Sequence, residues 1–212
     1  MRRVDWLVDV CENTWMQRNA KQEAILQAAG EQFNRYGYRK TSMDDIARRM
    51  GVSRASLYSY FENKDEIFRS VSLVIHQRAL KRAKYYLFAE ETRTQALAIK
   101  VENALLSRHS PFLKAVIRSA HGDELFDEYS RLCGDIVQDS HAAFQTLLAK
   151  ALNSASKTGY IDLKAAGMTG KNAAEILNLG AAGLKQGSPD ALTFRRRIRR
   201  LVKVFLSGLK VS

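Results

Sequence analysis

The chain has 212 residues, of which 46% are hydrophobic and 26% are charged, a composition that is typical of a folded globular protein and excludes a disordered one. Its 34 Lys and Arg residues outnumber its 22 Asp and Glu residues. The net charge of +12 favours a polyanionic partner without identifying it, because residues 1–68 carry 11 basic and 10 acidic side chains. Cys11 and Cys133 are too few for a disulfide framework, the histidines lack metal-ligand spacing, and no apolar stretch approaches the roughly 20 residues of a membrane span. We therefore expect a cytoplasmic protein without a metal or a cofactor.

Helix signals begin near Asn19 and stop at Gly37. Asn19 is a suitable N-cap with Gln22 three residues further on, and glycine readily ends a helix. Residues 1–18 are expected to be an N-terminal extension, in which Met1–Thr14 are disordered or an added arm and Met16 is a candidate for the natural start. The apolar stripe of this helix comprises Ile25, Ala28, Ala29, Phe33 and Tyr36.

Two short helices are predicted next, joined by a tight turn. The first runs from Thr41 to Gly51, and the second starts at Ser53. Glycine can adopt the left-handed conformation that such a turn requires, Val52 can fill the angle between the helices, and Ser53 can cap the second one. The inward-facing positions are Met43, Ile46, Ala47, Met50, Leu57 and Phe61. This geometry is typical of a helix-turn-helix, whose second helix enters the major groove of DNA.

The remainder of the chain favours helices, because the period-2 alternation of strands is nearly absent. A fourth helix starts at Asn63, with Glu66 completing a capping box, and continues to near Lys84. Each of the two prolines follows a serine, as in an N-cap followed by the first helical residue. Further helices are expected at about 94–108, after Ser110, and at about 124–156, 172–185 and 189–209. The predicted fold is all-α, a three-helix N-terminal helix-turn-helix domain on a larger helical body.

Residues 22–68, which include ILQAAGEQFNRYGYRKTSMDDIARRMGVSRASLYSYFENKDEIF, resemble the N-terminal domain of the tetracycline-repressor (TetR) family. The positions that carry the resemblance are Ala29, Phe33, Gly37, Thr41, Ile46, Ala47, Gly51, Val52, Ser53, Leu57, Tyr58, Phe61 and Lys64. One departure is Ala55, where the family often has glycine. The resemblance implies a DNA-binding domain at 19–68 and a helical ligand-binding and dimerisation domain at 69–212.

The resemblance further implies a set of DNA contacts. Base-edge contacts would come from Arg54, Ala55, Ser56 and Ser59, and phosphate contacts from Thr41 or Ser42, Tyr58, Tyr60 and Lys64. The helical spacing agrees, because the inward positions Leu57 and Phe61 leave Arg54 on the open side, where arginine can chelate a guanine. For the two tyrosines, a place in the core is the alternative.

A dimer is the second implication of the resemblance. Glycine and alanine in 176–183 would let two helices approach closely, and the last helix carries an apolar stripe. The predicted interface comprises Ile176, Gly180, Ala181, Gly183, Phe194, Ile198, Leu201, Val202 and Phe205. The alternative is that both stripes close the core of a single copy. The arginines at 195–200 are interpreted as a solvated face.

A small-molecule effector is the third implication. Candidate ligand contacts are inward polar or aromatic residues of the body: Tyr86, Arg108, Phe112, Tyr129, Cys133, His141 and Phe144. The expected function is therefore that of a ligand-responsive repressor that binds a palindromic double-stranded operator as a homodimer in the nucleoid.

Two other functions compete with that of a repressor. An enzyme is disfavoured because the sequence lacks the nucleophile-elbow, P-loop, zinc-protease and dinucleotide motifs, and Asp44 is better interpreted as a capping residue than as half of a catalytic pair. A helical interaction or small-molecule-binding protein without operator-specific DNA binding remains the alternative. The intact surface from Arg54 to Tyr60 favours the regulator.

Overall fold

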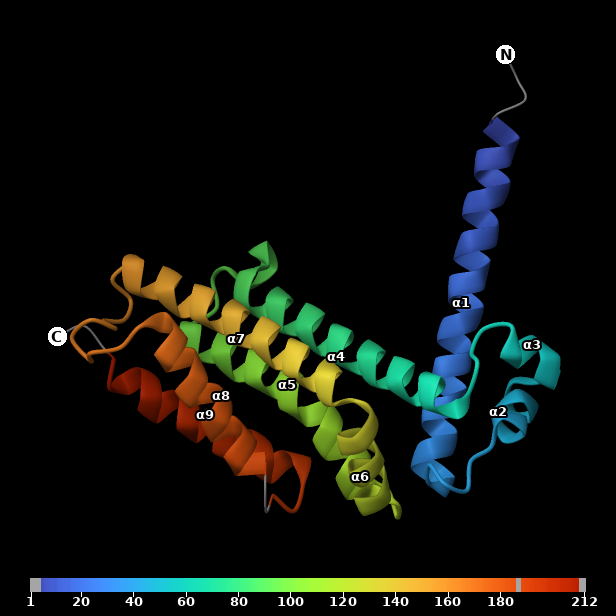
Figure 1. The fold of residues 1–212 in the computed structure, drawn as a ribbon. Helices are drawn as coiled ribbons and strands as arrows, with labels where there is room; N and C mark the ends of the chain where they lie inside the picture. The colour runs from blue at the N-terminus through green and yellow to red at the C-terminus, as the bar shows by residue number, and fades with distance from the viewer. Residues whose placement is uncertain (1–4, 186–187, 210–212) are drawn as a thin grey trace. The chain divides into compact units, whose positions relative to one another are not determined.

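The structure, a computed structural model, describes residues 5–185 and 188–209, with the side chains of 20–111, 119–185 and 188–209. This part of the chain is all helical, which confirms the predicted fold class (Figure 1). Its elements are α1 (Asp5–Tyr36), α2 (Met43–Met50), α3 (Arg54–Tyr58), α4 (Lys64–Phe88), the 3-10 helix η1 (Glu90–Thr92), α5 (Leu97–Arg118), α6 (Gly122–Leu132), α7 (Gly134–Lys157), α8 (Gly170–Lys185) and α9 (Ala191–Ser207). None of the described helices is long and apolar enough to cross a membrane.

The chain divides into two compact units. The head unit comprises Met1–Ser72 and Ser119–Leu132, and the body unit comprises Leu73–Arg118 and Cys133–Ser212. The head unit therefore contains α6, which is distant in sequence but packs against α1. The sequence predicted a domain boundary after residue 68 and did not indicate that Ser119–Leu132 also belong to the head unit.

The head unit is built on the C-terminal half of α1. Ile25, Ala29 and Phe33 are buried at the predicted spacing, and the helix ends at Tyr36 because Gly37 adopts a left-handed φ of 85°. The helix begins at Asp5, not at Asn19 as predicted, and it includes part of the predicted N-terminal extension. The physical reason is that no glycine or proline between them interrupts the helix.

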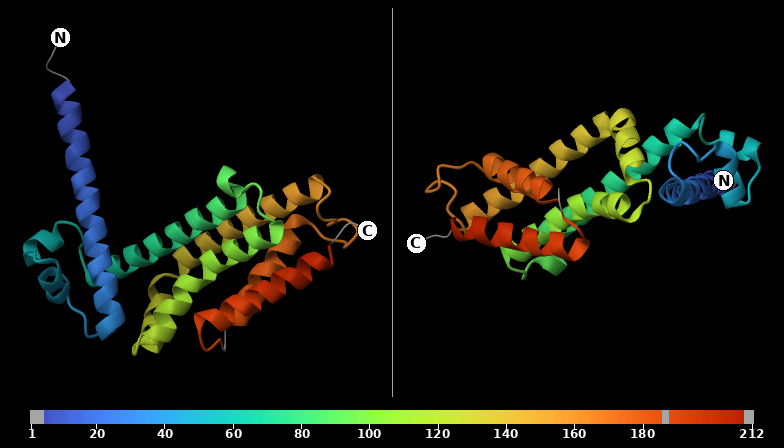
Figure 2. Two further views of the ribbon diagram at one scale, coloured as in Figure 1. Left: turned by 180° about the vertical axis from the view of Figure 1, so that it is seen from behind. Right: turned by 90° about the horizontal axis from the view of Figure 1, so that it is seen from below.

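The body unit is a bundle in which α7 packs along α8 and α5 along α9, while α8 also contacts α9 (Figures 1 and 2). Its core is continuous over these helices and includes Leu105, Phe144, Leu177 and Phe194. A side chain at Gly180 of α8 would crowd α9, because an added Cβ would lie 3.1 Å from the side chain of Leu201.

Three predicted helix boundaries in the body are wrong. Helix α5 continues through Pro111, so Ser110-Pro111 is not a helix start, and the predicted helix 124–156 is two helices separated at the buried Cys133. The last helix is capped by Asp190, whose carboxylate accepts from the Thr193 N–H at 2.7 Å.

Candidate nucleic-acid interface

The turn between α2 and α3 has the predicted geometry. Gly51 has φ 66° and ψ 30°, the left-handed conformation, and the Val52 N–H donates to the Ala47 carbonyl at 3.0 Å. The Ser53 hydroxyl accepts from the Ser56 N–H at 3.1 Å and thereby caps α3. A Cβ on Gly51 would meet nothing within 4 Å, so glycine is required there by conformation and not by space.

A capping box fixes the start of α2. The Asp45 N–H donates to the Ser42 hydroxyl at 3.2 Å, and the Asp45 carboxylate accepts from the Ser42 N–H at 3.0 Å. These hydrogen bonds from Ser42 lower the pKa of Asp45. The capping residue is therefore Asp45 and not Asp44. Thr41 is buried and donates to the Gly37 carbonyl at 2.7 Å, so of the two predicted phosphate contacts only Ser42 is exposed.

Helix α3 turns one side inward and leaves the other open. Leu57 and Phe61 are 0% and 2% exposed, as predicted. Tyr58 is 42% exposed, so the alternative that it belongs to the core is wrong. Among the other predicted DNA contacts, Arg54, Ala55 and Ser59 are exposed, whereas Ser56 and Tyr60 are half-buried.

Arg54 is held by two neighbours on the open side. Its Nε lies 3.3 Å from Asp44 Oδ1, and its Nη2 lies 3.4 Å from the Tyr58 hydroxyl, whose ring it also overlies. The hydrogen bond to Tyr58 and the charge of Asp44 raise the pKa of Arg54. Because all three side chains are exposed, these contacts are weak and exchange readily for a base or a phosphate.

Lys21 is a candidate that sequence reasoning missed. It lies on α1, outside the helix-turn-helix, yet its ammonium is 3.5 Å from the Ser56 hydroxyl and 5.8 Å from the centre of the Tyr60 ring. A cation at this place adds to the attraction for phosphate beside α3. The only signal in the sequence is that Lys21 precedes the buried Ile25 by one helical turn.

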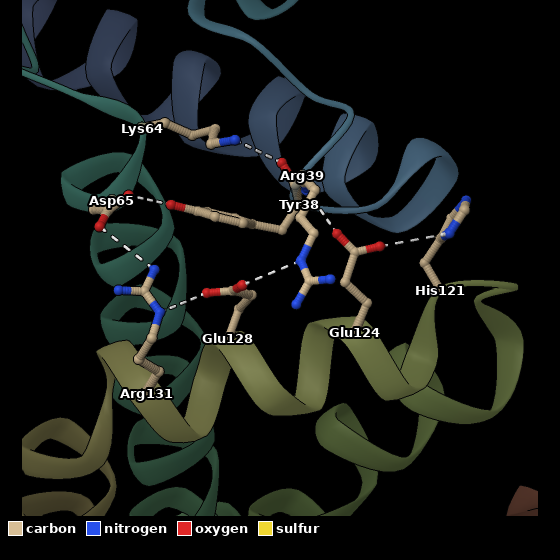
Figure 3. A network of polar contacts seen from close by, with 8 residues as sticks. All are labelled: Tyr38, Arg39, Lys64, Asp65, His121, Glu124, Glu128 and Arg131. Atoms are coloured by element: carbon tan, nitrogen blue, oxygen red, sulfur yellow. Dashed lines mark hydrogen bonds and ion pairs between the residues drawn. The ribbon is translucent and has the colours of Figure 1, made fainter.

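Lys64 occupies the first turn of α4, as predicted, but its ammonium points back to the turn after α1. It donates to the Tyr38 carbonyl at 2.8 Å and lies 4.1 Å from the centre of the Tyr38 ring (Figure 3). Burial lowers the pKa of Lys64, and the charge of Asp65 partly opposes this. The Tyr38 hydroxyl donates to Asp65, and burial raises the pKa of this tyrosine. A phosphate contact from Lys64 stays a prediction.

Acidic side chains of α6 bind the same turn. The Arg39 N–H donates to Glu124 Oε1 at 2.6 Å, and the Arg39 side chain is 3.7 Å from Glu128 Oε1 (Figure 3). Arg131 in turn donates to Glu128 Oε2 at 2.8 Å. A Cβ on Gly37 would lie 2.5 Å from a Glu124 oxygen, so a larger residue there would displace this carboxylate. These contacts join residues up to 85 positions apart, and nothing in the sequence indicated them.

The predicted ligand contacts are distributed over both units. Tyr129 belongs to the head unit, whereas Tyr86, Arg108, Cys133, His141 and Phe144 belong to the body unit. Phe144 and Cys133 are fully buried, Tyr86, Arg108 and His141 are half-buried, and Phe112 lies outside the described side chains. Among the described residues, no group of three His, Cys, Asp or Glu could hold a metal ion.

The predicted dimer residues divide between two environments. Ala181, Phe194, Ile198 and Val202 are at most 1% exposed and form part of the core of this copy, so they cannot contact a second one. For these four residues the structure supports the alternative of a closed monomer core. Ile176 and Gly183 are exposed, and Gly180, Leu201 and Phe205 are half-buried.

Comparison with known proteins places the helix-turn-helix in a family. Residues 25–71 match the model of bacterial regulatory proteins of the tetR family. The uncharacterized HTH-type transcriptional regulator YvdT of Bacillus subtilis is 26% identical over 150 residues, 70% of this chain and 75% of YvdT. Other curated regulators match over a shorter segment, and there the match spans about a quarter of their length.

Solved structures share the fold of the whole chain. A regulator of the TetR family from Mesorhizobium loti has a TM-score of 0.71 at 16% identity, over 91% of this chain and 98% of the other. SmeT, the repressor of the Stenotrophomonas maltophilia multidrug efflux pump SmeDEF, has a TM-score of 0.63 at 19% identity, over 89% of each chain. Residues 25–71 thus carry the DNA-binding domain of bacterial regulatory proteins of the tetR family, and the chain shares the fold of solved regulators of that family.

Proposed function

We propose that this chain is a ligand-responsive repressor that acts in the nucleoid by binding a palindromic operator as a homodimer. The observation that carries the proposal is the two-sided α3, whose Leu57 is fully buried while Arg54 and Tyr58 are exposed. A helix wedged in this way presents its polar side to a groove. The proposed DNA contacts are Lys21, Ser42, Arg54, Ala55, Ser56, Tyr58, Ser59, Tyr60 and Lys64.

The outer faces of α8 and α9 support the dimer. Ile176 and Leu179 on α8 are 44% and 56% exposed, and Val204 on α9 is 72% exposed. Gly183 has nothing within 4 Å of an added Cβ and therefore lies on open surface. A second copy packed on these residues would bury apolar side chains and give the two-fold symmetry that a palindrome requires.

An effector is proposed by analogy with a relative. SmeT has been solved as a complex with triclosan, with a TM-score of 0.64 to this chain at 19% identity. A ligand changes DNA affinity only if it binds the two states of the protein differently. The effector site is sought in the body unit, because the head unit is accounted for by the DNA interface.

Selection from a random-sequence duplex library tests the proposal. The full chain should enrich a palindrome, and binding to it should exceed binding to scrambled DNA by roughly 10³-fold or more at physiological salt. Raising the salt concentration should weaken binding to the palindrome and to scrambled DNA. The slope of log affinity against log salt concentration is set by the number of phosphates that the protein neutralises. Equal affinity for enriched and scrambled DNA would instead favour a helical binding protein without operator recognition.

A further inference from the structure

The outer side of α9 carries a row of cations that the DNA interface of the head unit does not use. Spacings of three and four residues place these cations on one side of the helix. All of them are exposed, and together they form the arginine stripe: Arg195, Arg196, Arg199, Arg200 and Lys203. The opposite side of α9 is fixed, because Phe194, Ile198 and Val202 are at most 1% exposed in the core of the body unit. The core therefore holds the stripe toward solvent.

Carboxylates compensate little of the charge of the stripe. Glu102 on α5 forms a bidentate contact with Arg199, at distances of 3.1 and 3.2 Å. Within the part of the chain that the structure describes, the other four cations of the stripe form no ion pair, and α9 itself contains no Asp or Glu. The remaining arginine of the run, Arg197, is turned away from the stripe, since it is half-buried and donates to the Ser188 hydroxyl at 3.0 Å. The stripe thus presents a concentrated positive charge to a partner.

Duplex DNA is a polyanion of matching charge density. An α-helix rises about 1.5 Å per residue, so the stripe from Arg195 to Lys203 extends over about 12 Å. A duplex carries about seven negative charges over that length. The guanidinium group binds phosphate oxygens in a bidentate manner, and four of the five cations are arginines. DNA is also the polyanion that the helix-turn-helix of the head unit approaches.

An anionic membrane is the other extended surface that a row of cations can meet. A helix that lies on a membrane inserts an apolar face between the lipids while its cations contact the headgroups. On α9 the apolar face is already buried in the core, and neither of its aromatic residues, Phe194 and Phe205, is exposed. The exposed aliphatic residues Leu192 and Val204 lie at the two ends of the stripe and do not form a face. These features favour DNA over a membrane.

We propose that the arginine stripe is a second DNA-binding surface, which contacts the phosphates of a duplex without reading its sequence. Its cations raise the affinity of the protein for any duplex, because each neutralised phosphate releases a counterion. Phosphate contacts carry no sequence information, so changes in the stripe leave the sequence selected from a library unchanged. The inference goes beyond the proposed repressor, since it concerns a surface of the body unit and does not depend on an operator.

Salt titration on a scrambled duplex tests the stripe in the full chain. The triple variant Arg195→Gln, Arg196→Gln, Lys203→Gln removes three cations and leaves Arg199 paired with Glu102. Fluorescence anisotropy should show that this variant binds the scrambled duplex about 10-fold more weakly near 0.1 M salt. The slope of log affinity against log salt concentration should fall by about 2–3, because each neutralised phosphate contributes about 0.9. Thermal unfolding checks that the variant is folded.

Two control variants separate the stripe from net charge. The variant Lys81→Gln, Lys157→Gln, Lys164→Gln removes three exposed cations that are dispersed over the body unit, and it should keep the wild-type slope. The variant Arg195→Lys, Arg196→Lys keeps the charge of the stripe and should keep the slope as well. The proposal fails if the triple glutamine variant of the stripe binds as the wild type does, or if the dispersed variant or the lysine variant loses as much.

Vesicles and library selection distinguish the remaining outcomes. If the stripe variant loses binding to vesicles of phosphatidylserine and phosphatidylcholine but keeps its affinity for the scrambled duplex, the stripe is a membrane surface and the proposal fails. If the slope falls as expected while the wild type selects no palindrome, the repressor proposal fails and the second DNA surface stands. If the wild type selects a palindrome and the slopes are equal, only the stripe proposal fails.

Discussion

The head unit and the body unit use polar side chains in opposite ways. In the head, polar groups of α3 pair near the surface with partners close in sequence, as in Ser53 with Ser56 and Arg54 with Tyr58, three and four residues apart. In the body, the polar pairs are largely buried and join residues 32, 37 and 69 positions apart. An exposed polar group exchanges one hydrogen-bond partner for another at little cost. A buried polar group that loses its partner pays a desolvation penalty unless another group replaces that partner. The surface groups of the head are thus available to a partner that approaches from outside, whereas these polar pairs of the body are engaged within its core.

Removing an inward-facing ring from the head should have the largest effect. Phe61→Ala should reduce the free energy of unfolding by about 3–5 kcal/mol and abolish binding to the enriched duplex, because α3 loses its wedge. Urea unfolding and gel-shift measure the two effects. Tyr58→Ala is the matched control, since this exposed ring should contribute little to stability. A similar loss of stability in both variants would remove the distinction between the inner and outer sides of α3.

Acid should act on the body through its buried histidines. The pKa values of His76 and His109, about 4 and about 3, lie below the unfolded value of about 6.5, so the unfolded state binds more protons in between. The free energy of unfolding should therefore fall as the pH is lowered from 6.5 to 5, by about 3 kcal/mol for both together. Urea unfolding at several pH values checks this. The double variant His76→Gln, His109→Gln should flatten the profile, and an unchanged pH dependence in this variant would contradict the role of the two histidines.

Arg54→Ala should alter what the head recognises. The variant should lose about 1–3 kcal/mol of discrimination at one base position in each half-site, because it removes a bidentate contact to guanine. Repeating the library selection with the variant would show that position relaxed and the others retained. Arg196→Ala on the body is the control, and its selected sequence should match that of the wild type. An unchanged preference in Arg54→Ala would mean that this side chain contacts phosphate only.

Gly51→Ala should cost about 1–2 kcal/mol of stability, because a side chain is disfavoured at a left-handed φ. Space is not the cause, since an added Cβ meets nothing there. The matched control is Gly134→Ala in the body, which also has open space and lacks a positive φ, and which should be neutral or slightly stabilising. Thermal unfolding of both variants shows whether the loss of stability comes from the left-handed φ or from the added volume of the side chain. Equal effects would contradict the assigned turn.

The smallest expected change concerns Lys64. If its ammonium leaves Tyr38 for a phosphate, Lys64→Met should weaken binding to all sequences alike and reduce the slope of log affinity against log salt by about 1. Lys21→Met should behave in the same way and serves as the comparison on α1. An unchanged slope with reduced stability would show that Lys64 serves the head only through Tyr38.

The sequence could predict the helix-turn-helix because its determinants are local. The left-handed Gly51, the cap at Ser53 and the spacing of Leu57 and Phe61 lie within about ten residues, and each has a fixed physical meaning. Arg54 and Tyr58 were found for the same reason. The pairing of Arg54 with Asp44 was not found, because an exposed carboxylate has many possible partners.

The helix boundaries and polar contacts of the body could not be predicted, because the interactions that determine them are not local in sequence. Helix α5 passes through Pro111 and the chain breaks at Cys133, and both outcomes depend on helices that pack from elsewhere in the chain. The inward residues of α9 were assigned to a partner copy, since an apolar stripe looks the same whether it covers its own core or another surface. The link between Arg108 and His76 and that between His109 and Asn178 have no counterpart in any sequence pattern.

The discontinuous head has a practical meaning for anyone who builds sensors by exchanging modules between regulators. A chimaera cut after Ser72 would leave behind Glu124 and Glu128, the carboxylates that α6 extends to Arg39. The transplanted DNA-binding segment would then carry Arg39 without these two carboxylates into the other regulator. Carrying residues 119–132 along with the first 72 keeps the transferable part whole.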